Sequence, residues 1–150
     1  MRKLLLLSCL LATVTSASAQ LRNFRLDRMI GTPVDFPQDI QVSATGVMHV
    51  LDRVGLVKLD ATGRYLQTIP LRSATRTPDY RSLALDGQNN VFVVNRAASF
   101  VRKYSAGGDS LTQIGGAGTA PGQFQQPEGV AVDAAGNIYV ADTGNTACKN

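Results

Sequence analysis

Catalytic chemistry in this chain would rest on very few side chains. The 150 residues include a single histidine, His49, whereas a catalytic zinc site usually needs several histidines that converge on the ion. His49 stands between Met48 and Val50 in a strand-like pattern, which favours a packed side chain over a ligand. No nucleophile-elbow motif indicates a Ser-His-Asp triad around it. The sequence therefore predicts no catalytic residue, and on the question of enzymatic activity it leans toward none.

Carboxylate and amide oxygens, the ligands that calcium prefers, gather at several points of the chain. The same positions carry what tight turns require, since Asp and Asn side chains accept from nearby backbone N–H groups and Gly adopts positive φ. We therefore predict neither a metal nor another cofactor. We expect structural turn roles for nine residues: Asp52, Asp86, Asn95, Asp133, Gly136, Asn137, Asp142, Gly144 and Asn145.

Short apolar strands must position these turns. Residues 130–132 and 138–140 are rich in β-branched residues and flank the turn residues 133–137, a pattern typical of a β-hairpin. No segment after the first twenty residues has the apolar spacing of three and four that indicates a helix. The remainder is therefore predicted to be almost entirely β-structure.

The hairpin pattern occurs three times. Its turn begins at Ser43, Asp86 and Asp133, which are spaced by 43 and 47 residues. The segments that follow the first two copies also align, since residues 56–69 recur at 101–114 with a shift of 45. Such a period accommodates four short strands, and one four-stranded sheet must stack on neighbours to bury both faces.

The third copy carries the most specific motif. Gly115 and Gly116 lead through residues 121–124 to 127–133, and then to 136–145, with glycines, prolines, aspartates and apolar triplets in a fixed order. This order resembles an NHL repeat, one blade of a β-propeller. The resemblance implies an all-β fold of four-stranded antiparallel blades, of the kind that closes into six-bladed rings. About two and a half blades are expected here, with the remaining blades of the same propeller downstream.

The predicted organisation has two parts. Arg2 and Lys3, an apolar run over residues 4–14 and a small-residue site before Gln20 indicate a secretory signal peptide. We therefore expect export, to the periplasm, the cell surface or the extracellular space, and no membrane span after cleavage. The predicted segments are a signal peptide at 1–19, a partial propeller at 20–150, an outer strand at 22–30, blades at 37–70 and 80–114, a half blade at 127–142, and an irregular tail at 146–150.

One set of positions favours binding. Arg53, Arg96 and Thr143 each follow the second strand of a repeat. In propellers resembling this one, the corresponding loops lie on the face that commonly carries binding. Guanidinium groups on neighbouring blades could together engage an acidic group of a ligand, although solvated loop arginines are the simpler interpretation.

Charge excludes one class of partner. The formal net charge of +4 falls to +2 when Arg2 and Lys3 leave with the signal peptide, which is too little to indicate nucleic-acid binding. The favoured interpretation is an exported, rigid scaffold that binds a protein, a peptide or a glycan. Two alternatives stay open, namely a metal-dependent lyase, lactonase or esterase whose site lies largely in further blades, and a structural repeat of a larger cell-surface protein.

Overall fold

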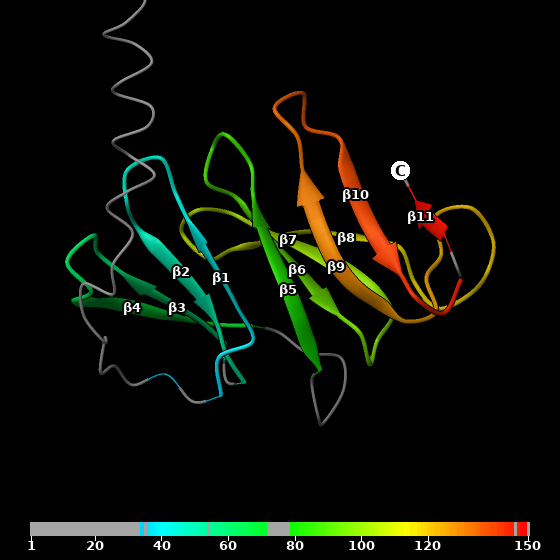
Figure 1. The fold of residues 1–150 in the computed structure, drawn as a ribbon, viewed down its shortest axis with the longest axis horizontal. Helices are drawn as coiled ribbons and strands as arrows, with labels where there is room; N and C mark the ends of the chain where they lie inside the picture. Colours follow the sequence, from blue (N-terminus) through cyan, green and yellow to red (C-terminus); the bar gives the residue numbers. More distant parts are fainter. Residues whose placement is uncertain (1–33, 35, 54, 72–78, 146, 150) are drawn as a thin grey trace, which may run out of the picture. The chain divides into compact units, whose positions relative to one another are not determined.

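A computed structural model describes residues 34, 36–53, 55–71, 79–145 and 147–149 of the chain. The predicted signal peptide, at 1–19, and the predicted outer strand, at 22–30, lie outside these residues. All regular elements in the described part of the chain are β-strands (Figure 1). Nowhere in it is there a helix with the length and apolarity needed to cross a membrane.

Blade 1 is a four-stranded sheet. It contains β1 (Asp39–Val42), β2 (Met48–Leu51), β3 (Gly55–Leu59) and β4 (Tyr65–Pro70) in chain order. Each strand pairs antiparallel with the next one along the chain. Short turns suffice for such neighbours, which is why the turn residues recur at close intervals.

Blade 2 repeats this arrangement. It contains β5 (Tyr80–Leu85), β6 (Val91–Asn95), β7 (Phe100–Tyr104) and β8 (Ser110–Ile114), again antiparallel and in chain order. β6 is buried along its whole length and β2 along most of it, so side chains on both faces of each blade are covered.

Blade 3 differs from the prediction at its end. Its three strands are β9 (Pro127–Val132), β10 (Ile138–Asp142) and β11 (Ala147–Lys149). The prediction of an irregular tail at 146–150 is therefore wrong for residues 147–149, which pair antiparallel with β10. A short edge strand needs only backbone hydrogen bonds to its neighbour, so it shows no apolar alternation in the sequence.

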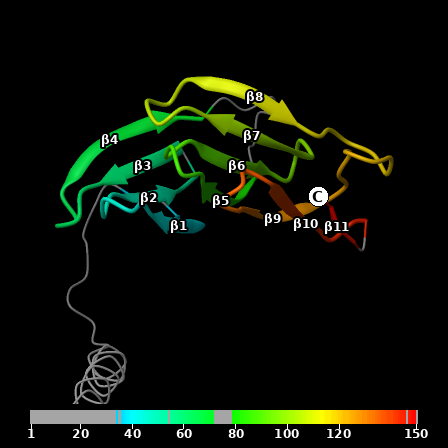
Figure 2. The ribbon, with the colours of Figure 1, turned by 90° about the horizontal axis from the view of Figure 1, so that it is seen from above.

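The hydrophobic core lies between the blades. Blade 1 packs on blade 2 through a cluster that includes Leu51, Leu56, Leu83 and Val93. Blade 2 packs on blade 3 through a second cluster. Its buried residues are Ala84, Phe92, Val94, Val101, Phe124 and Val140, and partly buried residues packed against them are Ile114, Val130, Val132 and Ile138. Figure 2 shows the first strands of the blades, β1, β5 and β9, side by side in chain order. Stacking thus buries faces that a single sheet would leave in water.

Candidate functional site

The loop after the second strand of blades 1 and 2 is built around one buried polar side chain. In blade 1 the Oδ1 atom of Asp52 accepts a hydrogen bond from the backbone N–H of Gly55 at 2.8 Å. In blade 2 the Oδ1 atom of Asn95 accepts from the N–H of Ala98 at 3.2 Å. Both side chains are fully buried, and these hydrogen bonds shape the loops.

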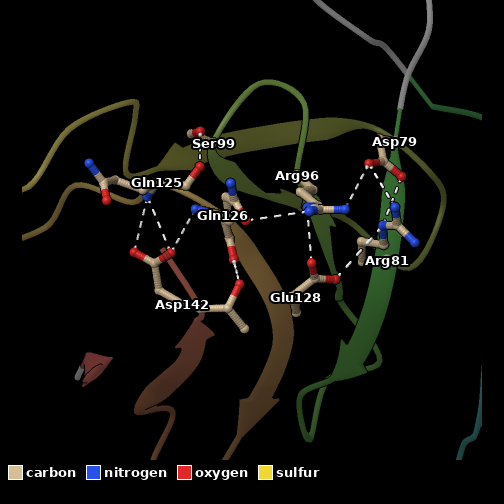
Figure 3. A network of polar contacts seen from close by, with 9 residues as sticks. Asp79, Arg81, Arg96, Ser99, Gln125, Gln126, Glu128 and Asp142 are labelled. Atoms are coloured by element: carbon tan, nitrogen blue, oxygen red, sulfur yellow. Dashed lines mark hydrogen bonds and ion pairs between the residues drawn. The ribbon is translucent and has the colours of Figure 1, made fainter. Parts of the chain in front are cut away.

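Asp142 occupies the same place in blade 3. Its Oδ1 atom accepts from the backbone N–H of Gln126 at 2.8 Å, and its carboxylate also accepts from the N–H of Gln125 (Figure 3). Burial raises the pKa of Asp142, but hydrogen bonds from Gln126, Gln125 and Asn145 together outweigh it and hold the pKa below its ordinary value. The ionised carboxylate thereby joins the segment before β9 to the end of β10.

Gly144 and Asn145 complete this junction. The side-chain amide of Asn145 donates to Asp142 Oδ2 at 2.5 Å and to the carbonyl oxygen of Gly118 at 3.3 Å. A Cβ atom at position 144 would lie 3.0 Å from the backbone nitrogen of Gln126. Only glycine therefore lets the loop approach so closely.

The turns after the first strands lie at the opposite end of the blades. Asp133 Oδ1 accepts from the backbone N–H of Asn137, and Oδ2 accepts from the Asn137 amide, both at 2.8 Å. Asp86 holds Asn90 in the same way in blade 2. Gly136 has φ of +87°, which side chains resist. These contacts account for the residue types at this end without any ligand.

Arg96 belongs to a cluster of four charges between blades 2 and 3 (Figure 3). Its Nε atom lies 2.9 Å from Glu128 Oε1, and its Nη1 atom lies 3.8 Å from Asp79 Oδ2. Arg81 pairs with the same two acids, at 2.8 Å to Asp79 and 3.8 Å to Glu128. We call these four residues the charged cluster.

The charged cluster has no net charge, and its side chains are about one third exposed. Its two guanidinium groups face two carboxylates, and the side chains are 32% to 36% exposed. Arg96 is thus already paired, so an acidic ligand would have to compete with Glu128 for it. Pairs at this exposure contribute little to stability, because water screens them.

Arg53 lies beside a hollow of about 300 Å³. Its Cζ atom is 5.9 Å from the centroid of the Phe36 ring, within the range of a cation–π contact. Asp79 of the charged cluster lines the same hollow, so the hollow and the cluster share a wall. The residues that line the hollow are Phe36, Gln38, Asp52, Arg53, Asp79 and Tyr80.

Phe36 is unusual in two respects. Its φ is +53°, a conformation that bulky residues rarely adopt, and its side chain is 65% exposed. A large apolar ring held out in water by a strained backbone often marks a place of contact with a ligand. Nothing in the sequence indicated this residue, because backbone strain leaves no signature in residue type.

Thr143 reaches the same region through Gln126. Its hydroxyl and its backbone N–H each donate to the carbonyl oxygen of Gln126 at 3.1 Å. The Oε1 atom of Gln126 in turn accepts a hydrogen bond from Arg96 Nη2 at 3.4 Å. The structure thus brings Arg53 and Arg96 to Asp79 from either side, and it connects Thr143 to Arg96 through one intervening residue.

Sequence reasoning missed Asp79, Arg81 and Glu128. A signal for two of them existed, since Arg81 and Glu128 are 47 residues apart, the spacing that relates blade 2 to blade 3. Opposite charges at one repeat position predict contact between neighbouring first strands. His49, by contrast, is only 2% exposed in β2. No group of three or more His, Cys, Asp or Glu side chains in the described ranges is arranged to hold a metal ion.

Solved structures define the class of fold. The chain is similar to a streptogramin B lyase structure, at 14% identity and a TM-score of 0.61 over 81% of this chain and 39% of that chain. It is also similar to a catalytically inactive virginiamycin B lyase from Staphylococcus aureus with quinupristin, at 16% identity and a TM-score of 0.63 over 83% of this chain and 41% of that chain. A luciferin-regenerating enzyme matches at 17% identity and a TM-score of 0.55 over 80% of this chain and 41% of that chain.

These matches are six-bladed propellers, and the described sheets are antiparallel blades of the same kind. The predicted fold class, an all-β propeller of which a part is present, is confirmed. The chain spans about two fifths of the length of the solved chains it matches. The family model of the NHL repeat matches residues 124–146, so the chain carries an NHL repeat. Comparison with curated protein sequences finds no match.

Proposed function

We propose that the chain is an exported NHL-repeat propeller that serves as a rigid scaffold, binding a protein, a peptide or a glycan in the hollow beside Arg53. The observation that carries the proposal is the composition of this hollow. It combines an exposed aromatic ring, Phe36, with a guanidinium group and the carboxylate of Asp79. Stacking on a ring together with a few directional polar groups is a frequent mode of recognition for sugars and peptides.

The surroundings of the hollow support rigidity. Asp52 and Asn95 fix their loops from within, and the charged cluster ties β5 to β9 at the neighbouring first strands. A site on such a framework loses little conformational entropy when a ligand binds. The side chain of Arg53 is the exposed cation that borders the hollow, so it is the natural residue to change.

The test begins with a glycan array and a peptide library exposed to the labelled protein. The affinity of the best ligand is then measured by isothermal titration calorimetry for the wild type and for Arg53→Ala. We expect about tenfold weaker binding for the variant, which corresponds to about 1.4 kcal/mol, with an unchanged melting temperature. Arg64→Ala is the matched control, because Arg64 is a highly exposed arginine after β3. Equal affinities for the wild type and Arg53→Ala would reject the proposal.

Export has its own test. The protein purified from the medium or the periplasm of an expressing cell should begin at Gln20 when its N-terminus is sequenced. A protein that keeps Met1 and stays in the cytoplasm would contradict the proposal of export, while leaving the binding site untouched.

A lyase is the second candidate, and the names of two similar structures favour it. At identities of 14% and 16%, however, the similarity shows a shared fold and not a shared activity. Incubation with quinupristin followed by mass spectrometry tests this candidate directly. A new product that chromatography separates from quinupristin, formed at a rate proportional to protein concentration, would establish catalysis, whereas intact quinupristin would remove this substrate.

A further inference from the structure

A buried imidazole lies where blade 1 packs on blade 2. His49 stands two residues before Leu51 in β2, so both side chains point to the same face of the blade. Leu51 belongs to the cluster that packs on blade 2. The side chain of His49 is 2% exposed, and neither of its ring nitrogens makes a hydrogen bond to any of the described residues. We call the packed surface between blades 1 and 2 the joint.

The imidazole is an unfavourable choice for packing at the joint. Blade 2 has Phe92 at the same register position, and a phenyl ring fills such a place without an unpaired polar atom. His49 instead leaves two buried nitrogens without partners among the described residues, which costs stability. Unlike a phenyl ring, an imidazole changes its charge between about pH 5 and pH 8. His49 thus makes the joint responsive to acid.

The surroundings of His49 favour its neutral form. Lys58 lies directly opposite His49 in the ladder between β2 and β3. Burial and then the charge of Lys58 hold the pKa of His49 below its ordinary value, and the backbone of Val47 raises this pKa by less. Ser43 stands where blade 2 has Asp86, so the turn before β2 offers no carboxylate.

The other charged side chains of the elements around His49 have partners of their own. These pairs are Asp39 with Ser82 and Leu83, Asp52 with Gly55, Arg53 with the ring of Phe36, Asp60 with Arg64, Arg81 with Asp79 and Glu128, Arg102 with Gln113, Lys103 with Asp86, and Asp109 with Ser105. In the described part of the chain, Lys58 is the charge that acts on His49. A protonated His49 would therefore stand beside an ammonium group, with no carboxylate of these residues bonded to it.

Two contacts connect His49 to the rest of the joint. The Nζ atom of Lys58 donates to the carbonyl oxygen of Ala106, in the turn between β7 and β8 of blade 2, at 2.5 Å. Repulsion by a protonated His49 would act on this ammonium group, and so on a hydrogen bond that crosses the joint. Leu51 packs in one cluster with Tyr80, which also lines the hollow beside Arg53. The joint therefore holds together the two walls of that hollow.

We propose that protonation of His49 opens the joint, so that the walls of the hollow, which come from blades 1 and 2, separate in mild acid. In the open state the imidazole reaches water and binds a proton with its ordinary pKa of about 6.5. The open fraction therefore rises as the pH falls below that value, by up to about tenfold per pH unit, until the pKa of the closed state is reached. The opening itself needs no ligand, whereas its consequence for binding rests on the proposed function.

Hydrogen–deuterium exchange of the full chain, measured by mass spectrometry without any ligand, tests the opening. Rates at pH 7.5 and pH 5.5 are corrected for the intrinsic pH dependence of amide exchange. We expect corrected exchange to rise about three- to tenfold in peptides that cover residues 48–59 and 80–85. Peptides that cover residues 127–142 of blade 3 should change by less than about twofold. A rise of equal size in all three blades, or no rise at the joint, would overturn the proposal.

Two variants separate the imidazole from other effects of acid. His49→Phe should make exchange at the joint nearly independent of pH. Ser43→Asp keeps His49 but adds the carboxylate that blade 2 has at this position, and should weaken the response to acid because a protonated His49 is then compensated. Thr119→Asp adds the same charge at an exposed loop residue and should respond as the wild type does. A full wild-type response in His49→Phe or in Ser43→Asp would overturn the proposal, so each variant decides by itself if the other does not fold.

Discussion

Blades 1 and 2 treat the same buried position in different ways. In blade 2 Phe92 stands in β6, and the Nζ atom of Lys103 lies 4.9 Å from the centroid of its ring. The same ammonium group lies 3.2 Å from Oδ2 of Asp86, whose side chain is 8% exposed. Burial raises the pKa of Asp86, but hydrogen bonds from Asn90, Lys103 and Gln88 together hold the pKa below its ordinary value. The charge of Lys103 is thus compensated within its own blade.

Blade 1 has no acid at this point. Ser43 stands where blade 2 has Asp86, and His49 and Lys58 stand at the register positions of Phe92 and Lys103. Lys58 Nζ instead donates to the carbonyl oxygen of Ala106 in blade 2 at 2.5 Å. Burial lowers the pKa of Lys58. Burial also lowers the pKa of His49, and the neighbouring charge of Lys58 lowers it further.

The difference shows two solutions to one problem. A lysine stem buried between blades must place its charge on a partner. Blade 2 supplies a carboxylate from its own turn, whereas blade 1 uses a backbone oxygen of the next blade. The first solution stabilises a single sheet, and the second joins two sheets but leaves no negative charge to accept a protonated His49.

The largest effect is expected from removing the aromatic ring of blade 2. Phe92→Ala deletes a side chain that is 2% exposed and takes the ring from under Lys103. Large-to-small changes of buried phenylalanine cost about 3 to 5 kcal/mol of unfolding free energy. Urea denaturation followed by circular dichroism measures this loss. A cost below about 1 kcal/mol would show that the interface between blades 2 and 3 is not packed as described.

The second prediction concerns acid sensitivity in blade 1. The pKa of His49 in the folded protein lies below its ordinary value of 6.5, so the unfolded chain binds the proton at higher pH. Neutral His49 therefore makes its full contribution to the free energy of unfolding above about pH 6.5. This contribution is lost as the pH falls from there toward the pKa of the folded state, and the free energy of unfolding then decreases by up to about 1.4 kcal/mol per pH unit. Urea midpoints between pH 7.5 and pH 5 measure it.

His49→Phe is the matched variant for this prediction, because it gives blade 1 the residue of blade 2. We expect its stability to vary less with pH than that of the wild type over the same interval. Identical pH profiles for the two proteins would contradict the assignment of the acid sensitivity to His49.

A smaller effect is expected at the acid of blade 2. Asp86→Asn removes the charge that faces Lys103 but keeps a polar side chain at the turn. We expect a loss of about 1 to 2 kcal/mol at neutral pH, because one partner of a largely buried pair remains uncompensated. Asp109→Asn, at an exposed turn residue, should change the denaturation midpoint little. Equal midpoints for the two variants would indicate that Asp86 acts only as a turn residue.

The smallest effect is expected at the first turn. Asn89 of blade 2 has φ of +61°, and Gly46 of blade 1 has φ of +82° at the same register position. Asn89→Gly removes the backbone strain that a side chain causes at positive φ, but glycine also makes the unfolded chain more flexible. The net gain in the free energy of unfolding should therefore stay below about 0.5 kcal/mol. A loss above 1 kcal/mol in thermal or urea denaturation would show that the Asn89 side chain has a role beyond the turn.

The fold was predictable because its information is local and repeated. The turns at Asp86 and Asp133 and the apolar strands that follow them recur at nearly constant spacing, and repetition converts weak signals into a firm prediction. The strand at 147–149 was missed because an edge strand is held by its neighbour's backbone. Its own side chains show no alternation that would reveal it.

The candidate site was predictable only in part. Register placed Arg53 and Arg96 in corresponding loops, and the structure brings both to Asp79. The register could not indicate that Glu128 already pairs with Arg96, since ion pairs depend on side-chain geometry between blades. It was equally silent on Phe36, because neither its positive φ nor its exposure has a signature in residue type.

The most direct test of the proposed binding face is hydrogen–deuterium exchange measured by mass spectrometry, with and without the best ligand from the array. The account predicts slower exchange for the peptides that contain residues 36–53 and 79–81, which border the hollow, and unchanged exchange at the turn formed by residues 133–137. Protection confined to residues 133–137, or none anywhere at saturating ligand, would contradict it.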